Sequence, residues 1–173
     1  MRIRAVLKTA AVFAMAAVIM VVPAGAKAQA GDTVLKQAEI EKLLPEKVYY
    51  KGQSATTQLR NSGGVKFANG SYLLTTLVDT SGYSTGIQAK YQAYFITEEP
   101  IKIGGQKLAA GIYGIGFVDG DKLLVTDVGA HDVLTVSTGN DAGLARPRPL
   151  QVVADAAGGY RIYAGRRYVT VIR

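Results

Sequence analysis

The sequence predicts a mainly β protein, an antiparallel β-sandwich or open barrel with one short N-terminal helix. From Lys47 onward, short runs rich in Val, Ile, Tyr and Thr are broken by Gly, Asn and Asp at intervals of about 8–12 residues. Several of these breaks hold residues that tolerate a positive φ, as tight hairpin turns require. The length of 173 residues fits one domain, because globular domains average roughly 100–200 residues.

The N-terminal segment has the three-part pattern of a secretory signal peptide. Basic residues precede a weakly polar to apolar run from Thr9 to Val22, and small residues follow. We expect cleavage after Ala28 or Ala30, which leaves a single domain over 31–173. The apolar run is shorter than the ~20 residues of a membrane-spanning helix, so we expect no permanent membrane span. The predicted location is the periplasm or the extracellular space.

The remaining elements follow from local pattern. Residues 32–44 contain no Gly or Pro and end at Pro45, which predicts a short helix. Residues 84–97 predict a helical turn leading into a strand, and 138–149 form the longest expected loop and the most mobile element. The expected strands cover 47–51, 55–60, 65–67, 71–78, 91–97, 111–118, 122–126, 133–137, 150–155, 160–164 and 167–172.

Three turns can be predicted from residues that tolerate a positive φ. Asn69-Gly70, the glycine between Asp119 and Asp121, and Gly165-Arg166 all supply positive-φ residues, so the flanking strands should be antiparallel neighbours. Gly114 and Gly116 lie inside an expected strand and not before a helix. We interpret them as sites of a sheet bend or close packing, not as a dinucleotide motif.

The charge is unevenly distributed. Removing residues 1–30 takes away four basic residues and no acidic ones, so the net charge falls from +7 to +3. Residues 142–173 carry six Arg and no Lys, against Asp155 alone. Arginine favours planar, bidentate contacts with carboxylates and phosphates.

The composition excludes several kinds of chemistry. The chain has no cysteine and one histidine, which removes thiol catalysis, disulfides and histidine-rich metal sites. We expect no metal and no cofactor. Export, a modest charge and the absence of a basic-aromatic motif argue against nucleic acid as a partner.

One motif could carry catalysis. Residues 82–86 match the G-x-S-x-G of a nucleophile elbow and place Ser84 before Asp127 and His131, the order that α/β-hydrolases use. That scaffold needs a parallel sheet with crossover helices, which this sequence does not predict. A triad depends on geometry and not on fold, so Ser84, Asp127 and His131 remain a candidate catalytic set.

The C-terminal hairpin predicts a ligand-binding surface. A two-residue turn at Gly165-Arg166 pairs Tyr163 with Tyr168, and alternation then puts both rings on one face with Arg161. With Arg166 and Arg167 nearby, this face could stack a sugar ring or hold an acidic polymer. The alternative is a tyrosine pair that only stabilises the hairpin.

The segment 101–115, Ile-Lys-Ile-Gly-Gly-Gln-Lys-Leu-Ala-Ala-Gly-Ile-Tyr-Gly-Ile, resembles one that recurs in uncharacterised secreted bacterial β-domain proteins. There a strand, a Gly turn, a Leu and an Ala-Gly-x-Tyr lead into the next strand. The resemblance implies a β-sandwich-like envelope protein and brings no catalytic residues.

The sequence therefore predicts an exported, non-enzymatic binding module of the cell envelope. Its expected partner is an envelope polysaccharide or an acidic protein surface, recognised by Arg161, Tyr163, Arg166, Arg167 and Tyr168. Two alternatives stay open: a small serine hydrolase using Ser84 and His131, and a structural subunit that assembles by β-strand addition. The oligomeric state is left open.

Overall fold

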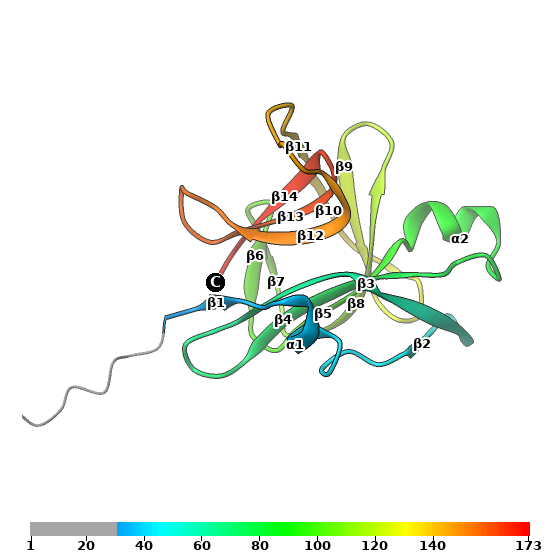
Figure 1. The fold of residues 1–173 in the computed structure, drawn as a ribbon. Coiled ribbons are helices and arrows are strands. Elements are labelled where there is room, and N and C mark those ends of the chain that lie inside the picture. The colour runs from blue at the N-terminus through cyan, green and yellow to red at the C-terminus, as the bar shows by residue number, and fades with distance from the viewer. Residues whose placement is uncertain (1–30) are drawn as a thin grey trace, which may run out of the picture.

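The protein folds into two antiparallel sheets that pack face to face, with two short helices. The computed structural model describes residues 31–173, and the predicted signal peptide lies outside them. Eight strands form one sheet and six form the other, which confirms the predicted mainly β, antiparallel sandwich (Figure 1).

The eight-stranded sheet contains most of the first two thirds of the described chain. Its strand order is β1-β3-β4-β5-β8-β9-β10, and β2 pairs with β3. The bounds are β1 (Thr33–Val34), β2 (Lys47–Tyr50), β3 (Gln53–Lys66), β4 (Tyr72–Val78), β5 (Ala93–Thr97), β8 (Gly111–Val118), β9 (Lys122–Thr126) and β10 (Asp132–Ser137).

The six-stranded sheet combines the C-terminal strands with a hairpin from the middle of the chain. Its order is β12-β13-β14-β6-β7, and β11 pairs with β14. The bounds are β6 (Ile101–Ile103), β7 (Gln106–Leu108), β11 (Gly139–Asn140), β12 (Arg148–Ala154), β13 (Tyr160–Gly165) and β14 (Arg167–Ile172).

The N-terminal helix is much shorter than the predicted 32–44. Only α1 (Gln37–Ile40) is helical, and turns follow it. Thr33 and Val34 instead pair with the end of β3, and the Leu35 N–H donates to the Gly64 carbonyl. The first residues therefore join the sheet, which satisfies more backbone groups than an isolated helical turn could.

A second helix, α2 (Thr85–Lys90), precedes β5. This confirms the helical turn leading into a strand, although the domain as a whole has two helices where one was expected. Two glycines of β8 make room for this region. A Cβ at Gly116 would overlap the Lys90 carbonyl, and one at Gly114 would lie 2.6 Å from the Tyr91 ring, so close packing explains both.

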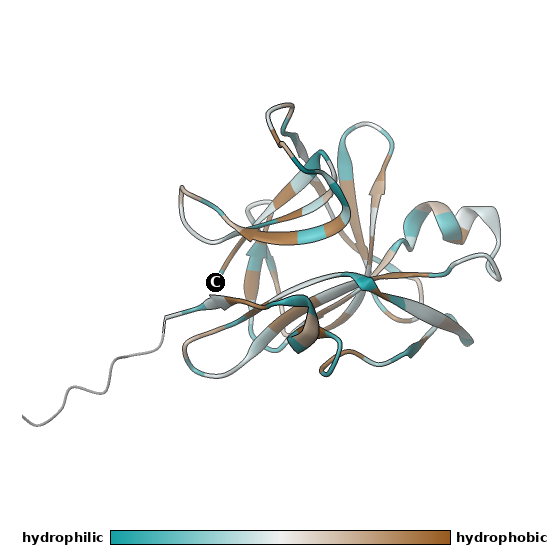
Figure 2. Cartoon of the chain, viewed as in Figure 1, coloured by the Kyte–Doolittle hydropathy of each residue, from teal (hydrophilic) through white to brown (hydrophobic). Residues whose placement is uncertain are grey.

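The main core lies between the two sheets, and Figure 2 shows hydrophobic residues along the strands on both sides of it. A second core covers the outer face of the eight-stranded sheet beneath α1, β2 and α2. Its centre is aromatic: the rings of Tyr50 and Tyr91 stack with centroids 3.7 Å apart, and Tyr83 meets both edge-on.

The C-terminal hairpin has the predicted register. Gly165 and Arg166 form the turn, Gly165 has a φ of 62°, and Tyr163 pairs with Tyr168. The inward side chains join the main core as expected, and they are Tyr160, Ile162, Val169 and Val171.

Candidate functional site

The predicted tyrosine–arginine face is partly covered by the chain itself: Tyr163 is buried, and the other four residues are half-buried or exposed. Tyr163 is only 2% exposed, and Asp141, the first residue after β11, lies against its hydroxyl. The Tyr163 hydroxyl donates to Asp141 Oδ2 at 2.9 Å, and Gly139 packs directly on the Tyr168 ring. An internal carboxylate thus occupies the position where we expected an anionic ligand.

Arg161 is also paired within the chain. Its Nε donates to Asp155 Oδ2 at 2.8 Å, and its guanidinium lies 4.4 Å from the centroid of the Tyr168 ring. The hydrogen bond from Arg161 holds the pKa of Asp155 below its usual value, with a further backbone bond from Ala157. This cluster fixes the hairpin to the loop before β13.

The two arginines after the turn bind backbone carbonyls. Arg166 Nη1 donates to the carbonyls of Ala142 at 2.7 Å and Leu144 at 2.8 Å, which fixes the segment between β11 and β12. Arg167 Nη2 donates to the Val118 carbonyl at 2.6 Å and so links the two sheets. Both arginines therefore have a structural role in this conformation.

The candidate catalytic residues are only partly connected. His131 Nδ1 lies 2.9 Å from Asp127 Oδ2, and the bonds from His131 hold the pKa of the Asp127 carboxyl below its usual value. Ser84 is the exposed residue before α2, and no hydrogen bond joins it to His131 within residues 31–173. Among residues 31–173 the structure therefore shows an oriented histidine but no Ser84–His131 hydrogen bond.

The described residues form a pocket where the edges of the two sheets meet beside α1. This α1–β12 pocket has a volume of about 470 Å³. Its walls come from β1, α1, β3 and β12, and its lining residues are Val34, Leu35, Lys36, Gln37, Ile40, Ser62, Gly63, Arg148, Gln151, Val152 and Val153.

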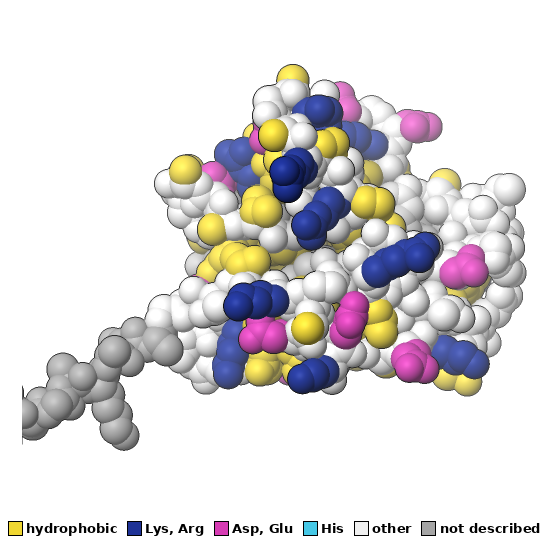
Figure 3. All heavy atoms as spheres, in the orientation of Figure 1, with side chains coloured by type: hydrophobic (Ala, Val, Ile, Leu, Met, Phe, Trp, Pro, Cys, Tyr) yellow, Lys and Arg dark blue, Asp and Glu magenta, His cyan; other side chains and the backbone are white. Residues whose placement is uncertain are grey.

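The charge of this pocket is positive. Lys36 and Arg148 line it, no acidic residue does, and neither cation forms an ion pair with any residue of 31–173. Figure 3 views this side of the molecule and shows Lys and Arg side chains over the region of β12, with Asp and Glu side chains around α1. The uncompensated charge favours an anionic group.

Gln151 also lines this pocket. Its Nε2 atom is buried and has no partner in the described part of the chain. A buried donor without a partner costs about 1–3 kcal/mol, so proteins rarely retain one. Because the Nε2 atom is buried, a ligand hydroxyl or carboxylate would reach it only after the side chain moves.

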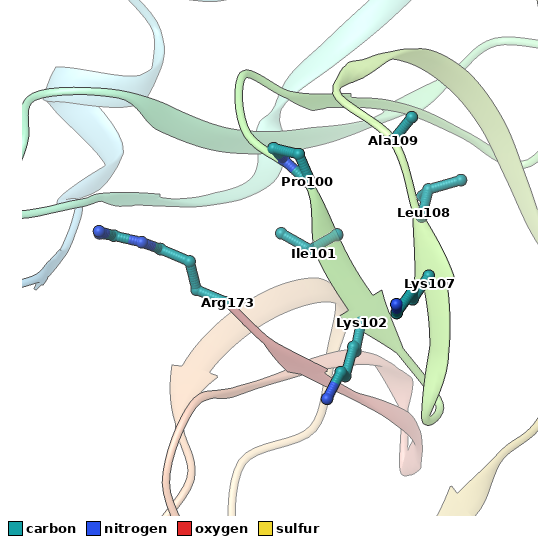
Figure 4. A pocket seen from close by; sticks show the side chains of 7 residues that line it. All are labelled: Pro100, Ile101, Lys102, Lys107, Leu108, Ala109 and Arg173. Atoms are coloured by element: carbon teal, nitrogen blue, oxygen red, sulfur yellow. The ribbon is translucent and has the colours of Figure 1, made fainter.

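A second pocket lies at the β6–β7 hairpin and has a volume of about 460 Å³. This β6–β7 pocket is mainly apolar, and Figure 4 shows its lining side chains, which are Pro100, Ile101, Lys102, Lys107, Leu108, Ala109 and Arg173. It is separate from the α1–β12 pocket, since the two share no residue.

No group of three His, Cys, Asp or Glu side chains in residues 31–173 could hold a metal ion. None of the helices in that range has the length and apolar character needed to cross a bilayer.

The described residues therefore form a two-layer antiparallel β-sandwich. It has two open pockets, and the lining of each includes cations that form no ion pair within residues 31–173. Comparison with protein-family models, with curated proteins and with solved structures gives no match. The resemblance of segment 101–115 to secreted bacterial β-domains therefore stays a prediction.

The sequence did not single out Lys36, Gln151 or the two lysines of the β6–β7 pocket. Lys36 lies within the segment expected to be helical, so nothing indicated that it would face β12. Arg148 did belong to the arginine-only strip, which was the one available signal.

Proposed function

We propose that the protein is an exported, non-enzymatic binding module of the cell envelope that recognises an acidic carbohydrate polymer in the α1–β12 pocket. The observation that carries this proposal is the pair of exposed cations, Lys36 and Arg148, which line one cavity and form no ion pair within residues 31–173.

The chemistry of the lining matches a sugar acid. A carboxylate would accept charge-assisted hydrogen bonds from Lys36 and Arg148, and a ring hydroxyl would accept one from the Gln151 amide. Aliphatic side chains such as Val152 and Leu35 offer surface for the C–H face of the ring. The volume lies within the 300–1,000 Å³ or so of small-molecule sites.

The proposed ligand is of the class predicted from the sequence, an anionic or carbohydrate polymer, but the proposed site is the α1–β12 pocket and not the C-terminal hairpin. Arg161, Arg166 and Arg167 already have internal partners, and Tyr163 is buried, so a ligand would have to displace these partners to bind there. The α1–β12 pocket needs no such displacement.

Calorimetric titration with oligogalacturonate tests the proposal. We expect binding that weakens with salt, since the contacts are ionic. The double variant Lys36→Gln/Arg148→Gln should bind roughly tenfold or more weakly. The matched control Lys47→Gln/Lys122→Gln removes two exposed cations from other strands and should bind like the wild type.

Two results would contradict the proposal. One is no binding of oligogalacturonate, and the other is an equal loss in both double variants, which would indicate unspecific attraction by net charge. Neutral oligogalactose of the same length serves as the ligand control and should bind much more weakly.

The hydrolase alternative has one supporting observation, the Asp127–His131 pair. A serine-directed covalent probe tests it. Because Ser84 makes no bond to His131, we expect no labelling that disappears in Ser84→Ala.

A further inference from the structure

A second exposed arginine lies close to the α1–β12 pocket. Arg148 lines the pocket, and Arg146 precedes it by two residues. Two residues of chain span at most about 7 Å, so the two Cα atoms lie within that distance of each other. All residues from Ala145 to Pro149 are exposed. Arg146 is therefore within reach of a ligand that binds at Arg148 and extends out of the pocket.

The positive charge of this segment is not compensated by the described residues. No acidic residue occurs from Ala142 to Ala154. Neither Arg146 nor Arg148 forms an ion pair with any residue of 31–173. Figure 3 shows Lys and Arg side chains over the region of β12. Because like charges this close repel each other, a row of anions along the segment would lower the electrostatic energy more than a single anion.

The two arginines alternate with prolines, in the order Arg146-Pro147-Arg148-Pro149. Each proline fixes its own φ, and the residue before a proline is restricted to extended backbone. All four residues are therefore limited to extended conformations. A ligand that binds a preorganised segment loses less conformational entropy than one that must order a flexible loop.

The chain is also anchored on both sides of this segment. Before it, Arg166 Nη1 donates to the Leu144 carbonyl at 2.8 Å. At its C-terminal side, Arg148 is paired with Gly165 of β13. The contacts of Arg166 thus hold in place a segment that presents two other arginines to solvent.

We propose that the binding site continues from the α1–β12 pocket along the Arg146–Pro149 segment, so that the protein binds consecutive acidic units of one polymer chain. This inference rests on the proposed function, because Arg148 belongs to both parts of the site. One sugar acid places its carboxylate at Lys36 and Arg148, and a following one places its carboxylate at Arg146. The ligand class is then a run of adjacent sugar acids, because an isolated acid among neutral sugars reaches only one part of the site.

NMR titrations with one acidic unit and with three test this inference. The ligands are methyl α-galacturonoside and trigalacturonate, and the measured quantity is the ratio of their affinities. That ratio should be roughly fivefold larger for the wild type than for Arg146→Gln, because only the longer ligand reaches Arg146. Statistical effects of ligand length are the same for both proteins and cancel in the comparison.

A matched variant controls for the loss of one positive charge. Lys107→Gln removes an exposed cation from β7, in the other sheet edge, and should show the wild-type ratio. Trigalacturonate with all carboxylates methyl-esterified has the same length without the charge and should bind equally weakly to the wild type and to Arg146→Gln. Thermal unfolding checks that both variants are folded.

The extension of the site is overturned if Arg146→Gln shows the wild-type ratio while Lys36→Gln/Arg148→Gln still weakens binding of both ligands. In that case the proposed function stands. Failure of the proposed function is a different result, in which Lys36→Gln/Arg148→Gln binds both ligands like the wild type, and the extension then fails with it. Tighter binding of linear triphosphate than of trigalacturonate, with the same loss in Arg146→Gln, would overturn the sugar acid in favour of a phosphate polymer.

Discussion

Two tyrosines stack in the second core, and replacing each by Phe should change the free energy of unfolding in opposite directions. Tyr91 is fully buried, and its hydroxyl has no hydrogen-bond partner in the described residues. The Tyr50 hydroxyl, on the ring stacked against it, forms a 2.7 Å hydrogen bond with Thr126 Oγ1. Removing one hydroxyl removes an unsatisfied group, whereas removing the other breaks a bond.

The expected magnitudes follow from these contacts. Tyr91→Phe keeps the ring and its stacking and should stabilise the fold by about 1 kcal/mol, because a buried unpaired hydroxyl costs about 1–3 kcal/mol. Tyr50→Phe should cost about 1 kcal/mol, since Thr126 retains a second acceptor in the Gly114 carbonyl at 3.2 Å. For a domain of this size, each change corresponds to a shift of about 2–4 °C in Tm.

Urea unfolding followed by circular dichroism measures both free energies of unfolding, and differential scanning calorimetry gives Tm. Equal destabilisation by the two mutations would refute the reasoning. It would mean that the Tyr91 hydroxyl has a stabilising partner in solution.

Three further predictions concern packing and pH. Gly116→Ala should destabilise the fold by about 2 kcal/mol or more in urea unfolding, because its Cβ would overlap the backbone at the end of α2, whereas Gly86→Ala in open space should be neutral or slightly stabilising. Arg161 lowers the pKa of the Asp155 carboxyl, so the ionised carboxylate stabilises the fold above about pH 4 and this stabilisation is lost as the pH falls. The difference in free energy of unfolding between wild type and Asp155→Asn should therefore disappear below about pH 4. Burial, with a bond to a carboxylate, raises the pKa of Tyr160 to about 12. Its contribution is present below about pH 10 and is lost between about pH 10 and 12, so Tyr160→Phe should make the alkaline loss of stability shallower.

The strands of the C-terminal hairpin were predictable because their register depends on local chemistry. A two-residue turn at Gly165-Arg166 fixes every pair, and alternation then fixes the faces. The bounds 111–118, 122–126 and 167–172 agree with β8, β9 and β14 for the same reason.

The short strands could not be predicted, because their stability comes from partners far along the chain. β1 is held by the end of β3, and β11 by β14. The predicted strands 55–60 and 65–67 are parts of one long strand, β3, whose pairing with β4 shifts register between Gln58 and Ser62. A bulge of this kind breaks the alternation from which strands are read.

The candidate site could not be fully predicted for the same reason, because it depends on contacts between residues far apart in the chain. Pattern placed Arg161, Tyr163 and Tyr168 on one face, but no local signal showed that Asp141 would cover it. The α1–β12 pocket depends on the contact of β3 with β12, where a Cβ at Gly63 would lie 2.6 Å from the Val152 nitrogen. A close contact of this kind between distant strands produces no periodic pattern in the sequence.

The most direct test of the central claim is an NMR titration of the ¹⁵N-labelled protein with trigalacturonate, following the side-chain amide of Gln151. We expect a saturable shift of that amide together with the backbone signals of Lys36 and Arg148. Shifts confined to Tyr163, Tyr168 and the segment between β11 and β12, with the Gln151 amide unchanged, would contradict it.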